Sequence, residues 1–175
     1  MTCELLTKVL DARGGLANCD NASLNAEVIV LGGPFWTLRG WPDPEPPRTV
    51  SMDAHREHIT MAPFPWRDQR SMFDVDPERL AIRTKAGRVV EQRNDPRTSF
   101  TPFDLQTTAW DPIQIAHFGS AANWNHFTQP FSFTHPGVGV HEIEPWQEAD
   151  QTWRRLAVHL PPSNANHKPD QIFNN

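Results

Sequence analysis

Tyrosine is absent from this chain of 175 residues, and cysteine occurs only twice. Two cysteines are not the disulfide framework that holds small secreted domains together, although Cys3 and Cys19 could pair with each other. Phenylalanine, histidine and tryptophan supply the rings instead, with ten, eight and seven residues. The composition therefore excludes a disulfide-rich secreted domain.

Long apolar runs and clusters of basic residues are also missing. No run approaches the ~20 apolar residues that a membrane-spanning helix needs. Glu4 stands where a secretory signal would carry its basic residues. The net charge is −5 and the isoelectric point is near 5.9, whereas a nucleic-acid-binding surface needs clustered Lys and Arg. We therefore expect a soluble, cytoplasmic protein with no membrane span and no nucleic-acid partner.

The patterns of common catalytic and cofactor sites do not occur either. The pairs Gly14-Gly15 and Gly32-Gly33 are typical of turns and match neither a P-loop nor a dinucleotide-binding fingerprint. The chain has no G-x-S-x-G nucleophile elbow, and neither cysteine lies in a recognisable nucleophile context. We expect no cofactor, and the motifs alone do not name a reaction.

Two stretches have the features of helices. Apolar residues in 4–13 recur at the i, i+3, i+4 spacing of an amphipathic helix, and the two glycines that follow end it. Asp111 is a suitable N-cap residue, and Pro112 stands at the first helical position, where its missing N–H costs nothing. We therefore predict an N-terminal helix and a second helix over residues 111–128.

Alternation of apolar and polar residues predicts short strands. The clearest strand covers residues 24–30, where every second residue from Leu24 onward is apolar. Lys85-Ala86-Gly87 is typical of a tight hairpin turn, with glycine at the position of positive φ. The other predicted strands are residues 35–40, 49–54, 57–61, 79–84, 88–93, 138–144 and 152–160. Residues 146–151 are predicted to form a loop.

Strands at this spacing, without alternating helices, favour an antiparallel sheet over a βαβ fold. We predict the α+β class with mainly antiparallel β structure: a curved sheet or open half-barrel with an N-terminal helix and one inserted helix. A single domain of residues 1–175 fits the length. Its expected parts are an N-terminal helix within 1–15, antiparallel strands within 24–105, the inserted helix over 111–128, and C-terminal strands and a tail over 138–175.

Histidines and carboxylates are the candidates for catalysis, although no motif joins them. His55 and His58 have metal-ligand spacing only for a helix, and on a strand residues three apart point to opposite faces, so we expect no metal site. His141, His159 and Glu144 lie on the last two long strands and are the catalytic candidates, as members of a His–carboxylate pair. The alternative is that these residues are solvated and structural.

Several motifs resemble those of a family of uncharacterised bacterial proteins. They are Val9-Leu10-Asp11-Ala12-Arg13-Gly14-Gly15-Leu16, Asp95-Pro96-Arg97-Thr98-Ser99-Phe100, Trp110-Asp111-Pro112, Glu144-Pro145-Trp146 and Thr152-Trp153-Arg154-Arg155-Leu156. The resemblance runs over nearly the whole chain in the same order, and it implies no established reaction. It implies a fold similar to that of the bacterial lipoprotein carriers, in which a curved antiparallel sheet closed by helices holds an apolar ligand.

The chain departs from that family pattern in two ways. His117, Ala121 and His126 stand where the family has tyrosines, and Asn123 replaces an apolar residue, which implies a more polar pocket. The chain stops at Asn175, where family members continue, so we expect it to be C-terminally shortened. A sheet edge left unpaired by this shortening would favour a homodimer.

Seven tryptophans are too many for one small core, and a tryptophan side chain is suited to line a pocket. Our first hypothesis is non-covalent binding of a hydrophobic or amphipathic small molecule in the concavity of the curved sheet. The expected ligand-binding residues are Trp36, Phe118, Trp124, His126, Phe127, Trp153, Arg155 and His159.

Two other function classes remain open from the sequence. One is a cofactor-free enzyme, a cyclase, isomerase or hydrolase, that uses a His–carboxylate pair in the same cavity. The other is an interaction module whose exposed sheet edge recruits a partner.

Overall fold

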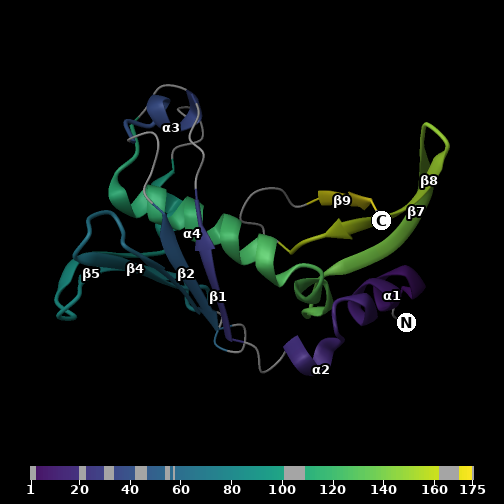
Figure 1. Cartoon of the computed structure of the whole chain (residues 1–175), viewed down its shortest axis with the longest axis horizontal. Coiled ribbons are helices and arrows are strands. Elements are labelled where there is room, and N and C mark those ends of the chain that lie inside the picture. Colours follow the sequence, from purple (N-terminus) through teal and green to yellow (C-terminus); the bar gives the residue numbers. More distant parts are fainter. Residues whose placement is uncertain are drawn as a thin grey trace. The chain divides into compact units, whose positions relative to one another are not determined.

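The computed structural model describes residues 3–19, 23–29, 34–41, 47–53, 56, 58–100, 109–161 and, for the backbone only, 170–174 (Figure 1). The chain divides into two compact units. One, here called the terminal unit, contains residues 1–20 and 125–175, and the other, the central unit, contains residues 21–124. The expectation of a single domain stays a prediction.

The central unit is built on a six-stranded antiparallel sheet whose strands lie in sequence order. These strands are β1 (Ser23–Val28), β2 (Arg48–Asp53), β3 (His58–Ala62), β4 (Gln69–Asp74), β5 (Arg79–Thr84) and β6 (Val89–Asn94). The first and last strands do not pair with each other, so the sheet is not closed into a barrel. The mainly antiparallel α+β class predicted from the alternation is therefore confirmed.

One face of this sheet is buried beneath the helix α4 (Pro112–Thr128), which crosses it in Figure 1. Side chains on a strand point alternately to the two faces, so each strand contributes every second residue to the buried side. Ile59, Phe73 and Leu80 on that side are at most 1 % exposed. Phe73 packs edge-on against the ring of His117 on α4, with 5.2 Å between the ring centroids. The described part of this face is thus filled by the protein's own side chains.

The N-terminus of α4 has the cap that the sequence predicts. The backbone N–H of Gln114 donates to Oδ1 of Asp111 at 2.8 Å, and the N–H of Asp111 donates to Oε1 of Gln114 at 3.0 Å. This reciprocal pair is a capping box, which satisfies two of the N–H groups that a helix start leaves without partners. The predicted helix over 111–128 is confirmed.

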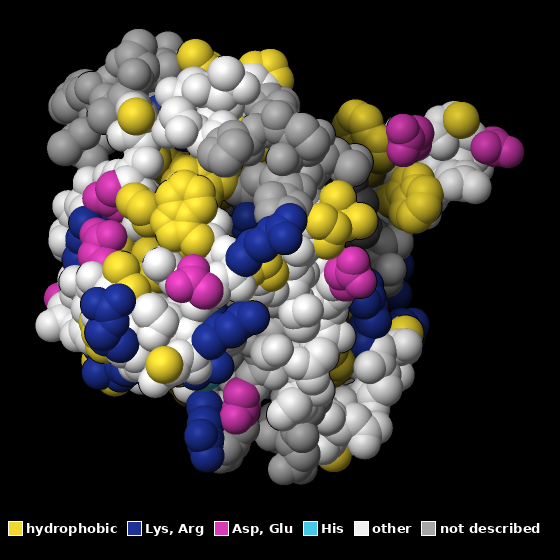
Figure 2. Space-filling view, turned by 60° about the vertical axis from the view of Figure 1, so that its left-hand side comes forward, with side chains coloured by type: hydrophobic (Ala, Val, Ile, Leu, Met, Phe, Trp, Pro, Cys, Tyr) yellow, Lys and Arg dark blue, Asp and Glu magenta, His cyan; other side chains and the backbone are white. Residues whose placement is uncertain are grey.

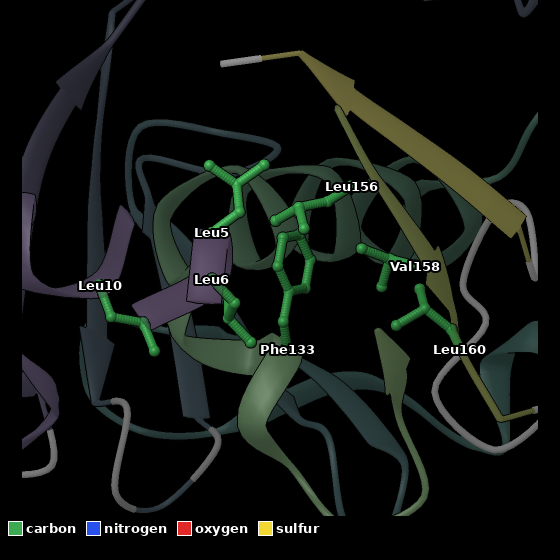
Figure 3. Packing of buried hydrophobic residues seen from close by; sticks show 7 residues of the cluster. All are labelled: Leu5, Leu6, Leu10, Phe133, Leu156, Val158 and Leu160. Carbon is green, nitrogen blue, oxygen red and sulfur yellow. The ribbon is translucent and has the colours of Figure 1, made fainter. Parts of the chain in front are cut away.

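The terminal unit packs helix α1 (Glu4–Ala12) against strand β8 (Gln151–His159), which lies between β7 (Gly139–Glu148) and β9 (Asp170–Asn174). The short helix α2 (Leu16–Cys19) and the 3-10 helix η2 (Phe131–Thr134) complete the unit. Its core is shown in Figure 3 and consists of Leu5, Leu6, Leu10, Phe133, Leu156, Val158 and Leu160. The predicted N-terminal helix and C-terminal strands are therefore present.

Three predictions about local structure are wrong. Residues 34–38 form the helix α3 (Pro34–Leu38) instead of a strand, because proline is compatible with the first helical turn. Strand β4 was not predicted. Its two buried positions are Ser71 and Phe73, and because Ser71 is polar the strand lacks a clear alternation of apolar and polar residues. Residues 146–148 continue β7 instead of forming a loop, because Trp146 pairs with Trp153 beyond a register shift.

The predicted hairpin turn is present, and some other predicted segments include residues that the structure does not describe. The predicted turn at 85–87 joins β5 to β6, and Gly87 has a φ of +88°. Residues 30–33, 54, 55, 57, 101–108 and 162–169 lie outside the described residues, so the predicted segments that include them are not tested there. Among the helices of the described ranges, none has the length and apolar character needed to cross a membrane.

We expect Asp111→Ala to destabilise the central unit by about 1–2 kcal/mol, since the cap hydrogen bond to Gln114 is lost. The ion pair between Oδ2 of Asp111 and Nη2 of Arg93, at 2.8 Å, is lost as well, but it adds less because Asp111 is 39 % exposed. The measurement is the free energy of unfolding in urea. Asp111→Asn is the matched control, because asparagine keeps the cap and removes the charge. Equal losses in both variants would contradict a role for the cap.

Candidate functional site

An open hollow of about 610 Å³ lies in the central unit where β4, β5 and β6 meet. Its lining consists of Asp74, Asp76, Pro77, Glu78, Arg79, Asn94 and Asp95. Four of these seven residues carry a carboxylate and one carries a guanidinium. The hollow is therefore polar and acidic, in contrast to the ring-lined cavity expected from the sequence.

Glu78 connects the wall of this hollow to the buried side of α4. Its Oε1 lies 3.1 Å from Nε2 of His117, and its Oε2 lies 2.9 Å from Nη2 of Arg97 in the 3-10 helix η1 (Pro96–Ser99). The side chains of Glu78 and His117 are only 13 % and 5 % exposed. The backbone N–H of Arg97 also donates to Oε1 of Glu78 at 3.2 Å. One carboxylate thus joins the β4–β5 turn, η1 and α4.

The surroundings of Glu78 keep it ionised. Burial acts to raise the pKa of this carboxyl group, but the interactions with His117 and Arg97 outweigh it, so the pKa lies below its ordinary value. His117 itself is enclosed by rings, with Phe73 at 5.2 Å and Phe100 at 5.5 Å between centroids. Because water has little access to His117, this pair is suited to hold the fold together more than to exchange protons with a ligand.

A second His–carboxylate pair lies on the opposite, open face of the sheet. Nδ1 of His58 is 2.7 Å from Oδ1 of Asp74, and the two side chains are 25 % and 31 % exposed. Nη2 of Arg79 donates to the other oxygen of Asp74 at 3.1 Å. Nε2 of His58 lies 3.2 Å from Oγ1 of Thr60. Asp74 and Arg79 also line the hollow, so this polar row borders it.

The pKa of Asp74 is lowered by the same kind of balance. Burial acts to raise it, but hydrogen bonds from His58 and Arg79 and the attraction of their charges outweigh the burial. The carboxylate is therefore ionised over the neutral pH range. An ionised carboxylate only accepts hydrogen bonds, so Asp74 accepts a hydrogen bond from the Nδ1–H of His58.

A cluster of aromatic rings lies at the end of α4 nearest α3. Trp110 is 5.5 Å from Phe35 and 5.4 Å from Phe118 between ring centroids, and Trp36 is 5.1 Å from Phe35 and 5.9 Å from Phe118. We call these four residues the ring cluster. Trp110 is only 9 % exposed, whereas Phe35 is 39 % exposed. The guanidinium carbon of Arg39 lies over Trp110, 4.7 Å from the ring centroid.

The ring cluster is the part of the described chain that best fits the expected apolar wall. Leu38, on the same helix as Phe35, is 57 % exposed and adds to the apolar surface. Figure 2 brings the side of α3, β4 and β5 forward and shows hydrophobic side chains gathered between charged ones. Such partly exposed aromatic surface is typical of a contact site for an apolar group.

The predicted ligand-binding residues are divided between the two units. Trp36, Phe118 and Trp124 lie in the central unit, and the first two belong to the ring cluster. The terminal unit contains the other predicted residues, namely His126, Phe127, Trp153, Arg155 and His159.

The predicted catalytic residues lie at exposed positions of the β7–β8 ribbon of the terminal unit. His141 and His159 share one face of this ribbon and are exposed, as is Glu144. Glu144 accepts a hydrogen bond through its backbone oxygen from Nε of Arg155 at 2.7 Å. On the same ribbon, Nε of Arg154 lies 2.6 Å from Oε1 of Glu142.

The sequence analysis did not find the residues of the two His–carboxylate pairs or Thr60 beside them. His58 was considered only as a metal ligand, and Thr60, Asp74 and Glu78 were not considered at all. His58 and Thr60 are two apart on a predicted strand, so their shared face was readable. Asp74 lies on the strand that was not predicted, so its position opposite His58 was not.

Within the described ranges, no group of three or more His, Cys, Asp or Glu residues is arranged to hold a metal ion. Cys3 and Cys19 are not joined in a disulfide. The chain matches no protein-family model, no curated protein and no solved structure.

We expect Glu78→Gln to lower the free energy of unfolding by about 2 kcal/mol at pH 7, because it removes a buried charged hydrogen-bond acceptor. The pKa of Glu78 is lowered in the folded protein, so its contribution is full above its ordinary value of 4.5 and is lost as the pH falls through the folded value. The difference between the variant and the native chain should therefore shrink on acidification.

Urea unfolding at pH 7 and at about pH 3 measures this difference. Glu91→Gln is the control, because Glu91 is 39 % exposed and contacts Arg93 only at 3.4 Å. A Glu78→Gln protein as stable as the native chain at pH 7 would contradict the anchoring role of Glu78.

Proposed function

We propose that this protein binds a small hydrophobic or amphipathic molecule at the ring cluster of the central unit. The observation that supports this proposal is the contact of four rings, of which Phe35 is 39 % exposed while Trp110 is buried. A ring set that is buried at its base and exposed at its tip offers a rigid apolar surface at low entropic cost.

The position of the ligand differs from the one expected at first. The centre of the sheet's covered face is occupied by side chains such as Ile59 and Phe73, which leave no exposed surface there. The proposal therefore places the apolar part of the ligand against α3 and the first half of α4. Of the predicted ligand-binding residues, it uses Trp36 and Phe118.

The link between the rings and the polar hollow favours an amphipathic ligand. His117 contacts Glu78 on one side and Phe100 on the other, and Phe100 packs on Trp110 with 5.0 Å between centroids. A continuous series of contacts thus joins the carboxylates of the hollow to the ring cluster.

A second candidate function is a cofactor-free enzyme, a cyclase, isomerase or hydrolase. Two His–carboxylate pairs border the hollow, and the pair of His58 and Asp74 is partly open to solvent. A histidine whose orientation is fixed by a carboxylate is the usual arrangement of a general base. This observation favours acid–base chemistry on the open face of the sheet.

Titration with alkylamines of increasing chain length, whose cationic head suits the acidic hollow, tests the binding proposal through tryptophan fluorescence. We expect the native chain to respond and Trp36→Phe to lose part of the response, because Trp36 and Trp110 are the two tryptophans of the ring cluster. Trp66→Phe is the matched control, since Trp66 is 63 % exposed and lies on the loop between β3 and β4. We expect it to keep the response.

Calorimetry measures the affinity for the ligand without relying on tryptophan fluorescence. We expect Phe35→Ala to weaken binding about tenfold, which corresponds to ~1.4 kcal/mol of lost aromatic contact. Val90→Ala is the control, because Val90 is 47 % exposed on β6 and outside the ring cluster. A native chain that binds no alkylamine, or a Phe35→Ala protein with native affinity, would count against the proposal.

A further inference from the structure

Three side chains on the open face of the central sheet form a continuous hydrogen-bonded series. Oγ1 of Thr60 is 3.2 Å from Nε2 of His58, and Nδ1 of His58 is 2.7 Å from Oδ1 of Asp74. A hydroxyl group, an imidazole and a carboxylate thus follow one another, with each end of the imidazole engaged. This is the geometry of a nucleophile, a general base and an orienting acid.

The backbone explains why these residues meet. His58 and Thr60 are two residues apart on β3, so their side chains point to the same face. Asp74 on β4 stands directly opposite His58 in the antiparallel register. Arg79 stands opposite Asp74 on β5 and donates to its second oxygen. Regular strand pairing, with no loop involved, therefore fixes the positions of all three groups.

The protonation pattern gives the imidazole the tautomer of a base. The carboxylate of Asp74 is ionised and accepts the Nδ1–H of His58. In the neutral imidazole, the lone pair is then on Nε2, which faces the hydroxyl of Thr60. In that tautomer, the Thr60 hydroxyl donates to Nε2.

We infer that Thr60, His58 and Asp74 form a nucleophilic triad that hydrolyses small carboxylic esters. This inference rests on the second candidate function above and names its nucleophile and its substrate class. His58 and Asp74 are partly exposed, so small esters and water both have access to the face. The substrate approaches from the side of the hollow, which begins at Asp74 and Arg79.

The reaction proceeds in two balanced steps. Oγ1 of Thr60 attacks the ester carbonyl carbon as its proton moves to Nε2 of His58, and the bond to the alcohol oxygen breaks as that oxygen takes the proton from His58. Water then attacks the acyl-threonine and gives one proton to Nε2, the carboxylic acid leaves, and the Thr60 oxygen recovers the proton. Asp74 stays ionised and stabilises the imidazolium in both steps.

The cross-strand neighbours of the triad are polar except for Met72, and Thr60 itself is partly exposed. Ser51 on β2 and Met72 on β4 stand opposite Thr60 in the register, and Asp53 stands opposite His58. The hydroxyl of Ser51 donates to Oδ1 of Asn25 at 2.7 Å. Ser51 is therefore committed to a neighbour, and Thr60 is the hydroxyl that contacts the base.

The test uses p-nitrophenyl acetate with the full chain. We expect an initial burst of p-nitrophenol, and mass spectrometry of peptides from acid-quenched protein should place one acetyl group on Thr60. Thr60→Ala and His58→Ala should each lower the rate by about a hundredfold or more. Thr60→Ser should keep the burst, since it retains the hydroxyl.

Asp74 is tested as the residue that positions the base. We expect Asp74→Asn to lower kcat with little change in KM, because the amide favours the wrong tautomer of His58 without altering substrate contact. Thr49→Ala is the matched control. Thr49 is an exposed threonine on β2, and it lies on the same face of the sheet as Thr60. It should keep the native rate and the acetyl group on Thr60. Circular dichroism verifies that each variant is folded.

The outcomes separate the nucleophile from the wider enzyme function. A Thr60→Ala protein that keeps the native rate, or an acetyl group found only on other residues, overturns the triad. If His58→Ala nevertheless abolishes turnover, acid–base catalysis by the His58–Asp74 pair stands without a covalent step. Absence of any turnover above that of the His58→Ala variant overturns the triad for this substrate class.

Discussion

The packing of α4 on one face of the six-stranded sheet is the constraint on which the central unit depends. Because strand side chains alternate between faces, each residue that is buried on the covered face leaves its neighbour in sequence on the open one. Ile59 and Phe73 are fully buried, and the next residues along the chain are Thr60 and Asp74. The polar series on the open face is thus a consequence of how the apolar face is buried.

The two His–carboxylate pairs differ in how far their side chains are buried, and this burial decides which role each pair can have. Leaving a buried charge without its partner is costly, so Glu78 and His117 form an anchor between the β4–β5 turn and α4. His58 and Asp74 keep about a quarter to a third of their surface exposed and remain accessible to a substrate. The ring cluster adds an apolar contact site to the same unit. The buried anchor and the two proposed sites therefore use different residues of the same unit.

Local patterns predicted much of the fold and little of the site. The cap at Asp111 and the spacing of apolar residues predicted α4 and α1, since helices depend on nearby residues. The helix at 34–38 and the strand β4 were not predicted, because their apolar patterns are short and tertiary packing overrides them. Trp36 and Phe118 were named as ligand contacts from composition, and the structure places both in the ring cluster. The binding role of that cluster is still a prediction.

The sequence by itself determined the class of the fold, because alternation and capping act over a few residues and are visible along the chain. It also determined that His58 and Thr60 share a face. Only the tertiary structure decided that Asp74 completes their series and that Glu78 reaches His117. Those contacts depend on strand register and on the docking of a helix from a distant part of the chain, and neither is encoded in any local spacing.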